Sequence, residues 1–174
     1  MLRSGLVARL LLGLVILPVT YGLVGAQEEE EKPMKPVPKS YAGKHMPAGW
    51  WTDPKIIAEG KKIFETAQIE IEFRGKKEQI KDGCSTCHGI DPEKDRPKAR
   101  GARDFRVAKK MNEFSDSYWF WRVSEGVPKT KMPAWKEKLS EEQRWKAIAY
   151  EHTFSHDGKP AVHEHKEIKV LVEP

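Results

Sequence analysis

The two cysteines of the chain lie three positions apart, and a histidine and a glycine follow at once: Cys84, Cys87, His88, Gly89. This spacing is typical of a c-type haem attachment site, in which two thiols form thioethers with the vinyl groups of one porphyrin edge. The imidazole of His88 then emerges over the ring face, where it can bind the iron from the proximal side. Gly89 is expected to let the backbone pass close to the macrocycle, because glycine has no Cβ.

A CxxC pair also occurs in zinc sites and in redox disulfides. A structural zinc site normally needs four ligands, often from two such pairs, and this chain has no other cysteine. A thioredoxin-like redox site would need a βαβ pattern around the motif, and the flanking sequence shows none. Attachment of one haem c through Cys84 and Cys87 is therefore the favoured interpretation.

A second stretch that could bind a metal is Val127–Trp135, which contains Met132. A thioether sulfur suits haem iron, and Met132 lies 44 residues after His88 (132 − 88). Pro133 stiffens the loop and removes a backbone donor. Met132 could instead be ordinary core filling. Three other residues could compete as ligands: Met111, His152 and His156.

Residues 1–26 have the features of a secretory signal: two arginines, an apolar run at 10–17 and small residues at 24–26. An uncleaved membrane anchor is the alternative, because the 17 residues from 10 to 26 are at the short limit for a membrane span. Covalent haem attachment in bacteria takes place outside the cytoplasmic membrane. We therefore expect a periplasmic or equivalent extracytoplasmic protein, with membrane contact only if the segment stays uncleaved.

The formal net charge is +5 over 174 residues. Removal of residues 1–26 takes away Arg3 and Arg9 and leaves +3 (29 basic minus 26 acidic residues). Two haem propionates would lower this value further. So mild a positive charge is not a nucleic-acid signature, and we expect no nucleic-acid partner.

Composition divides the exported chain into three parts: a Pro/Lys-rich linker at 27–49, one domain at 50–155 and a C-terminal tail at 156–174. The linker is expected to bury little and to leave His45 and Met46 solvated. In the tail, His163 and His165 could share a face and bind a metal. A solvated or partner-docking tail is the alternative, since no third ligand is evident.

The first and last helices of the domain have recognisable caps. Asp53 and Pro54 form a helix start, and the apolar face that follows contains Gly60. Glycine there weakens the helix by about 1 kcal/mol relative to alanine, which indicates a close approach of another helix. The last helix begins with a predicted capping box between Ser140 and Gln143.

Two further elements lie between these helices. A helix is predicted from Ser115 or Ser117 to about Glu125, with Gly126 as its stop. The stretch 68–74 alternates apolar and charged residues, as a half-buried strand or an extended loop would. The pattern leaves open whether this stretch is a hairpin or a distorted helix extension.

The order of these elements resembles class I c-type cytochromes, small monohaem electron carriers. In that family an N-terminal helix with a small residue crosses a C-terminal aromatic helix. Gly60 with Phe64 looks like the first partner, and Trp145 with Tyr150 looks like the second. The resemblance covers residues 50–155 and implies an all-α domain around one covalently bound haem c.

By this resemblance, Cys84 and Cys87 hold the haem, His88 is the proximal iron ligand and Met132 is the distal ligand. The family usually places a proline carbonyl against the N–H of the proximal imidazole, a bond that fixes the ring and tunes the iron. Two prolines could supply that carbonyl here: Pro92 and Pro97.

The resemblance implies one-electron transfer between respiratory redox partners rather than enzymatic catalysis. Histidine and methionine at both axial positions raise the reduction potential and leave no open site. The alternatives are a haem enzyme or gas sensor with an open distal site, and a mainly structural haem subunit of a larger complex. Residues 115–135 and 156–160 are also similar to small cytochrome subunits that accompany molybdenum respiratory oxidoreductases, nitrite-oxidising ones among them. Four lysines near Met132 are candidates for guiding a partner: Lys129, Lys131, Lys136 and Lys138.

Overall fold

A computed structural model of the chain describes residues 36–111, 113–162 and 170–171. The predicted signal segment at 1–26, the linker residues 27–35 and the tail histidines His163 and His165 lie outside the described residues. Within the described ranges, no helix has the length and apolar character that a membrane crossing requires.

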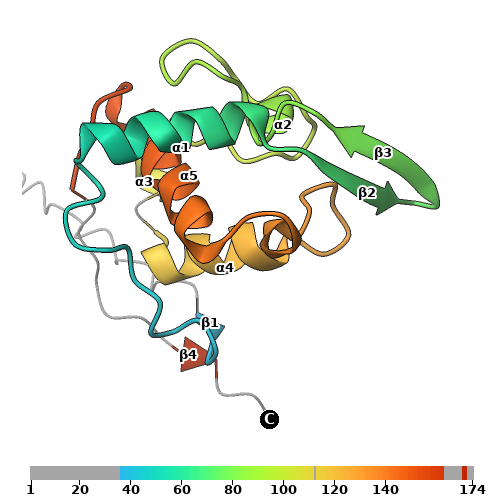
Figure 1. The fold of residues 1–174 in the computed structure, drawn as a ribbon, viewed down its shortest axis with the longest axis horizontal. Helices are drawn as coiled ribbons and strands as arrows, with labels where there is room; N and C mark the ends of the chain where they lie inside the picture. The colour runs from blue at the N-terminus through green and yellow to red at the C-terminus, as the bar shows by residue number, and fades with distance from the viewer. Residues whose placement is uncertain (1–35, 112, 163–169, 172–174) are drawn as a thin grey trace, which may run out of the picture. The chain divides into compact units, whose positions relative to one another are not determined.

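The first and last long helices, α1 (Pro54–Thr66) and α5 (Glu141–Thr153), cross each other (Figure 1). The carboxylate of Asp53 accepts hydrogen bonds from the first free N–H groups of α1, with Pro54 at the first helical position. At the start of α5, Ser140 and Gln143 exchange the two hydrogen bonds of a capping box. Both predicted helix starts are confirmed.

Gly60 is a point of close approach between the two helices. A Cβ atom at this position would lie only 1.9 Å from the carbonyl oxygen of Lys146 in α5. One turn later, the ring of Phe64 packs edge-on against Tyr150, with centroids 5.3 Å apart. The structure therefore confirms the predicted crossing through Gly60 and Phe64.

The middle helix α4 (Asp116–Glu125) packs against α5. Its first turn is capped by Ser115, and Gly126 ends it with a positive φ of 69°, as the sequence predicts. The ring of Phe120 stacks on Trp145 at a centroid distance of 4.2 Å. Shorter helical segments complete this part of the fold: α2 (Ser85–His88), α3 (Ala108–Met111), η1 (Trp135–Glu137) and η2 (Phe154–His156).

An antiparallel hairpin lies between α1 and α2, formed by β2 (Ile69–Phe73) and β3 (Lys76–Ile80). Arg74 and Gly75 turn the chain with φ values of 54° and 75°, which suit a two-residue hairpin turn. A short parallel pair, β1 (Val37–Pro38) with β4 (Val170–Leu171), is also present. The domain is mainly helical, and the all-α class is not confirmed.

Residues 36–49, within the predicted linker, pack on the helical core. Val37 has no exposed surface and Met46 is 8% exposed. The buried carboxylate of Asp116 accepts a hydrogen bond from the Met46 N–H at 2.9 Å and lies 3.1 Å from Nδ1 of His45. The expectation that Met46 is solvated is wrong, because the few apolar side chains of this segment pack beside α4.

We expect Asp116→Ala to lower the free energy of unfolding by about 1.5 kcal/mol, because the Met46 N–H loses its acceptor inside the protein. Urea denaturation measures the change. Glu72→Ala, at an exposed position of β2, is the matched control and should stay within about 0.5 kcal/mol of the native protein. Equal effects of the two substitutions would show that Asp116 does not hold the segment.

Candidate functional site

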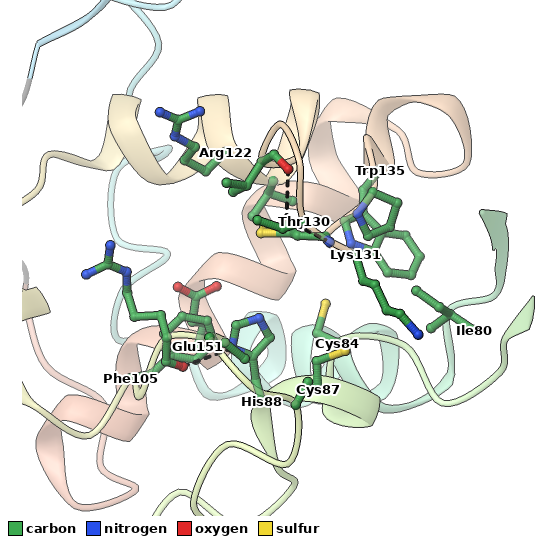
Figure 2. Close-up of a pocket in the computed structure, with 18 of the residues that line it drawn as sticks. Ile80, Cys84, Cys87, His88, Phe105, Arg122, Thr130, Lys131, Trp135 and Glu151 are labelled. Atoms are coloured by element: carbon green, nitrogen blue, oxygen red, sulfur yellow. Dashed lines mark hydrogen bonds between the residues drawn. The ribbon is translucent and has the colours of Figure 1, made fainter. Parts of the chain in front are cut away.

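A cavity of about 270 Å³ lies between α2, the segment 99–105, α4, the loop before η1 and α5 (Figure 2). Cys84, Cys87, His88 and Met132 all line it, so the four residues singled out in the sequence meet at one place. In Figure 2, Lys131 of the loop lies across the cavity from the side chains of α2. The roles of the four residues as haem ligands stay a prediction.

The short helix α2 determines how the two thiols are presented. The carbonyl of Cys84 accepts hydrogen bonds from the N–H groups of Cys87 and His88 at 3.1 and 3.0 Å, which closes one helical turn. Both thiols are free and both residues line the cavity. Burial raises the pKa of both cysteines, although the nearby Lys131 ammonium partly opposes this at Cys87. Both are therefore protonated thiols at neutral pH.

His88 is fixed by one hydrogen bond and one ring contact. Its Nδ1 lies 3.0 Å from the carbonyl oxygen of Arg103, and a carbonyl can only accept, so Nδ1 carries the proton. Its ring stacks on Phe105 at 4.3 Å with 14° between the planes. Burial lowers the pKa of His88, which keeps the imidazole neutral. The remaining nitrogen, Nε2, therefore carries the lone pair that a metal requires.

The carbonyl that holds His88 differs from the one predicted. The family resemblance predicts a carbonyl from Pro92 or Pro97, whereas the structure places the carbonyl of Arg103 there. The chain returns to α2 at Lys98 and Ala99, whose N–H groups donate to the carbonyl of Cys87 at 2.9 and 3.2 Å, and the acceptor for His88 follows at Arg103. A backbone carbonyl has no residue-type signature, so the sequence could not identify this acceptor.

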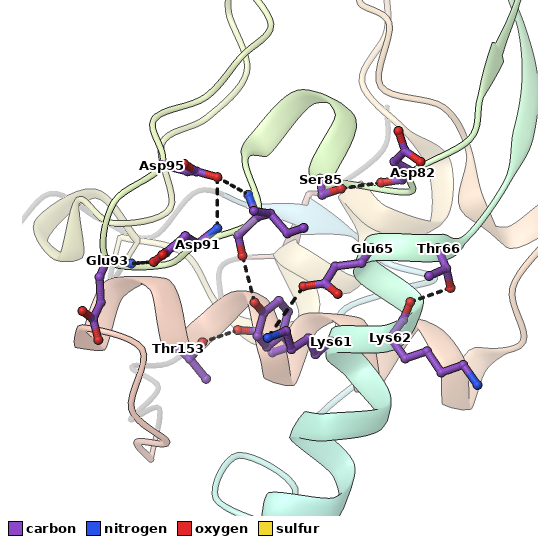
Figure 3. A network of polar contacts seen from close by, with 12 residues as sticks. Lys61, Lys62, Glu65, Thr66, Asp82, Ser85, Asp91, Glu93, Asp95 and Thr153 are labelled. Atoms are coloured by element: carbon purple, nitrogen blue, oxygen red, sulfur yellow. Dashed lines mark hydrogen bonds and ion pairs between the residues drawn. The ribbon is translucent and has the colours of Figure 1, made fainter.

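Gly89 serves the turn that follows His88. Its φ is +85°, and a Cβ atom there would lie 2.8 Å from the Cβ of Asp95. The Asp95 carboxylate accepts hydrogen bonds from the N–H groups of Ile90 and Asp91 at 2.9 and 3.2 Å (Figure 3). The hydroxyl of Tyr150 donates to the carbonyl of Ile90 at 3.1 Å. In this structure glycine is therefore required by the backbone conformation and by the closeness of Asp95, whereas the sequence predicts a role beside the macrocycle.

The distal loop, Val127–Trp135, holds Met132 through its own backbone. The N–H of Val127 donates to the carbonyl of Met132 at 3.2 Å, and the N–H of Met132 donates to the hydroxyl of Thr130 at 3.1 Å. The loop also presses against the end of α4, since a Cβ at Gly126 would lie 2.5 Å from the Met132 carbonyl oxygen. These contacts join the two ends of the segment Val127–Met132 and hold Met132 at the cavity.

The three rival ligands lie elsewhere. Met111 is 1% exposed within the hydrophobic core. The ring of His152 packs 4.7 Å from that of Trp51, and the ring of His156 lies 4.4 Å from that of His152. In the part of the chain that the structure describes, none of the three lines the cavity. The geometry favours Met132.

Glu151 and Arg103 also line the cavity, and neither is predicted from the sequence. Burial raises the pKa of Glu151 to about 8, an effect that the positive charge of Arg103 partly offsets. The guanidinium of Arg103 lies over the rings of Phe114 and Trp119, at 4.4 and 5.5 Å from their centroids. Glu151 could have been noticed, because it falls three residues after Ile148 on the apolar face of α5.

Two of the four lysines expected to guide a partner are engaged in ion pairs. Lys131 lies 2.6 Å from the carboxylate of Glu78, and Lys136 lies 2.7 Å from that of Glu125. A lysine that is paired with a carboxylate contributes less to the positive electrostatic potential that would attract a partner. Lys129 and Lys138 are the stronger candidates for that role.

A protein-family model described as cytochrome C oxidase, cbb3-type, subunit III, matches residues 74–150. The matched residues contain Cys84, Cys87 and His88, the distal loop and most of α5. This part of the chain is similar to a cytochrome c domain, and the match is consistent with a class I c-type cytochrome. Such domains in general bind haem and transfer electrons rather than catalyse reactions. Comparison with curated proteins and with solved structures gave no match.

Proposed function

We propose that the protein is a monohaem c-type cytochrome that carries single electrons between respiratory redox partners. The observation that carries this proposal is the meeting of Cys84, Cys87, His88 and Met132 at one cavity within a cytochrome c domain. The two thiols would hold haem c as thioethers, His88 Nε2 would bind the iron and Met132 would bind it from the distal loop.

The residues present fit such a cofactor. His88 is neutral, its ring is fixed by the Arg103 carbonyl, and Nε2 is the nitrogen left to ligate. Aromatic side chains of the cavity wall, including Phe105 and Trp119, would exclude water from the site. Haem c supplies a one-electron iron couple when bound. The work of the chain is then to hold the ligands, keep the site dry and present a docking surface.

The location and partners follow from the same proposal. We expect the protein outside the cytoplasmic membrane, where cytochrome c domains are usually found. Its partners would be redox proteins. The family description refers to an oxidase subunit. This favours partners that donate electrons to, or accept electrons from, this protein within a respiratory complex.

The test is the visible spectrum of the oxidised and reduced full chain, expressed with a c-type maturation system. We expect haem that survives denaturing electrophoresis, a low-spin spectrum and a weak far-red sulfur-to-iron band. Met132→Ala should abolish that band. Met111→Leu, which replaces a buried core methionine at similar volume, is the control and should retain it.

Each of the other outcomes would indicate a different function or a different distal ligand. A high-spin spectrum with ready cyanide binding would indicate an open distal site, as in a haem enzyme or gas sensor. A low-spin spectrum without the far-red band would assign the distal position to a histidine. Absence of covalently retained haem would overturn the proposal.

A further inference from the structure

The distal loop is held on one side by α4, through Gly126 and the Val127–Met132 hydrogen bond. Its other side contacts the hairpin β2–β3. The ammonium of Lys131 donates to both carboxylate oxygens of Glu78 at 2.8 and 2.6 Å. The same ammonium lies 5.7 Å from the ring centroid of Phe73. The residue next to Met132 is therefore bonded to the hairpin.

The hairpin register explains why these groups meet. Ile69 pairs with Ile80, and the pairs Ile71–Glu78 and Phe73–Lys76 follow at every second position. Alternate positions share one face of a sheet, so Glu78 lies on the same face as Ile80. Ile80 lines the cavity, and Figure 2 shows Lys131 extending from the distal loop toward it. This face of the hairpin is thus turned toward the site.

The opposite face of the hairpin supplies a comparison. Glu70 and Lys77 form an ion pair at 3.4 Å, with side chains 61% and 73% exposed. The side chains of Glu78 and Lys131 are 40% and 46% exposed. Both pairs are too exposed to contribute much to global stability. Only the second pair joins the hairpin to the distal loop, across 53 residues of sequence.

We propose that Glu78 is a positioning residue: through Lys131 it holds the distal loop so that Met132 stays at the iron. The hairpin then controls how readily another ligand displaces Met132. This inference rests on the proposed function, because it requires that Met132 binds haem iron. Glu78 and Lys131 both belong to this chain, and neither is itself a proposed iron ligand.

The experiment titrates imidazole into the ferric, haem-loaded full chain and follows the loss of the far-red band. Glu78→Gln and Lys131→Gln should each tighten apparent imidazole binding roughly two- to fivefold, the range of a partly exposed ion pair. Glu70→Gln, the same change on the opposite face, should leave it unchanged. The charge-swapped double variant Glu78→Lys/Lys131→Glu should restore most of the native resistance. Added salt should tighten imidazole binding in the native protein more than in Glu78→Gln.

The controls separate this inference from the proposed function and from a general loss of stability. A native protein without the far-red band would overturn Met132 ligation itself. A native band together with equal imidazole affinities in Glu78→Gln and Glu70→Gln would overturn the role of Glu78 alone. The urea midpoint of Glu78→Gln should equal that of Glu70→Gln; a clearly lower midpoint would mark Glu78 as a merely structural residue and overturn its positioning role.

Discussion

Gly60→Val is expected to lower the free energy of unfolding by about 3 kcal/mol, the upper part of the range for overpacked positions. The first added carbon would lie 1.9 Å from the carbonyl oxygen of Lys146, and 3.2 Å from the Cβ of Tyr150. A backbone atom cannot rotate away as a flexible side chain can, so α1 and α5 must move apart. Valine has a somewhat higher helix propensity than glycine, but this gain of a few tenths of a kcal/mol is much smaller than the cost of the overlap.

Urea unfolding of the haem-loaded protein measures the effect. Gly43→Val is the matched control, because a Cβ at Gly43 would meet no atom within 4 Å. That variant should unfold within about 0.5 kcal/mol of the native protein. A Gly60→Val protein as stable as Gly43→Val would show that the helices do not cross at this residue.

Glu151→Gln is expected to stabilise the protein increasingly as the pH rises. Burial raises the pKa of Glu151 to about 8 in the folded state, whereas glutamate in an unfolded chain titrates near about 4.3. Between these values the folded protein keeps a proton that the unfolded chain has lost, so native stability falls as pH rises. The change is complete above the folded-state pKa.

Glutamine cannot ionise, so the variant lacks this pH dependence. The difference in unfolding free energy between variant and native protein should therefore grow by about 4 kcal/mol from pH 5 to pH 8.5. Urea unfolding at several pH values, in one redox state, measures it. Glu137→Gln, which makes the same substitution at an exposed position, is the control and is unfolded at the same pH values. A flat Glu151→Gln difference would mean that the carboxyl is ionised in the folded protein.

Features that depend on neighbouring residues were predictable from the sequence. The caps at Asp53 and Ser140 and the stop at Gly126 all involve backbone groups within a few residues. The spacing of Cys84, Cys87 and His88 is likewise local, since Cys84 directly precedes the short helix that contains Cys87 and His88. Such patterns are readable because the residue types and the atoms they satisfy lie in one short window.

Only the first strand of the hairpin has a recognisable pattern in the sequence. Residues 69–73 alternate clearly, but the partner strand 76–80 is largely polar and carries no comparable pattern. Its place is set by the Arg74–Gly75 turn and by pairing with β2. Composition likewise failed for residues 36–49, where an average over prolines and lysines conceals that Val37 and Met46 are buried.

The sequence by itself indicated a resemblance to class I c-type cytochromes, a haem attachment motif and a principal candidate for the distal ligand. The tertiary structure decided which atoms surround them: the Arg103 carbonyl on His88, the buried carboxyl of Glu151 and the contact of Glu78 with Lys131. The last contact joins residues 53 positions apart. Contacts of this kind depend on the paths of the loops and on which helix faces pack together. Neither produces a periodic pattern of residue types in the sequence.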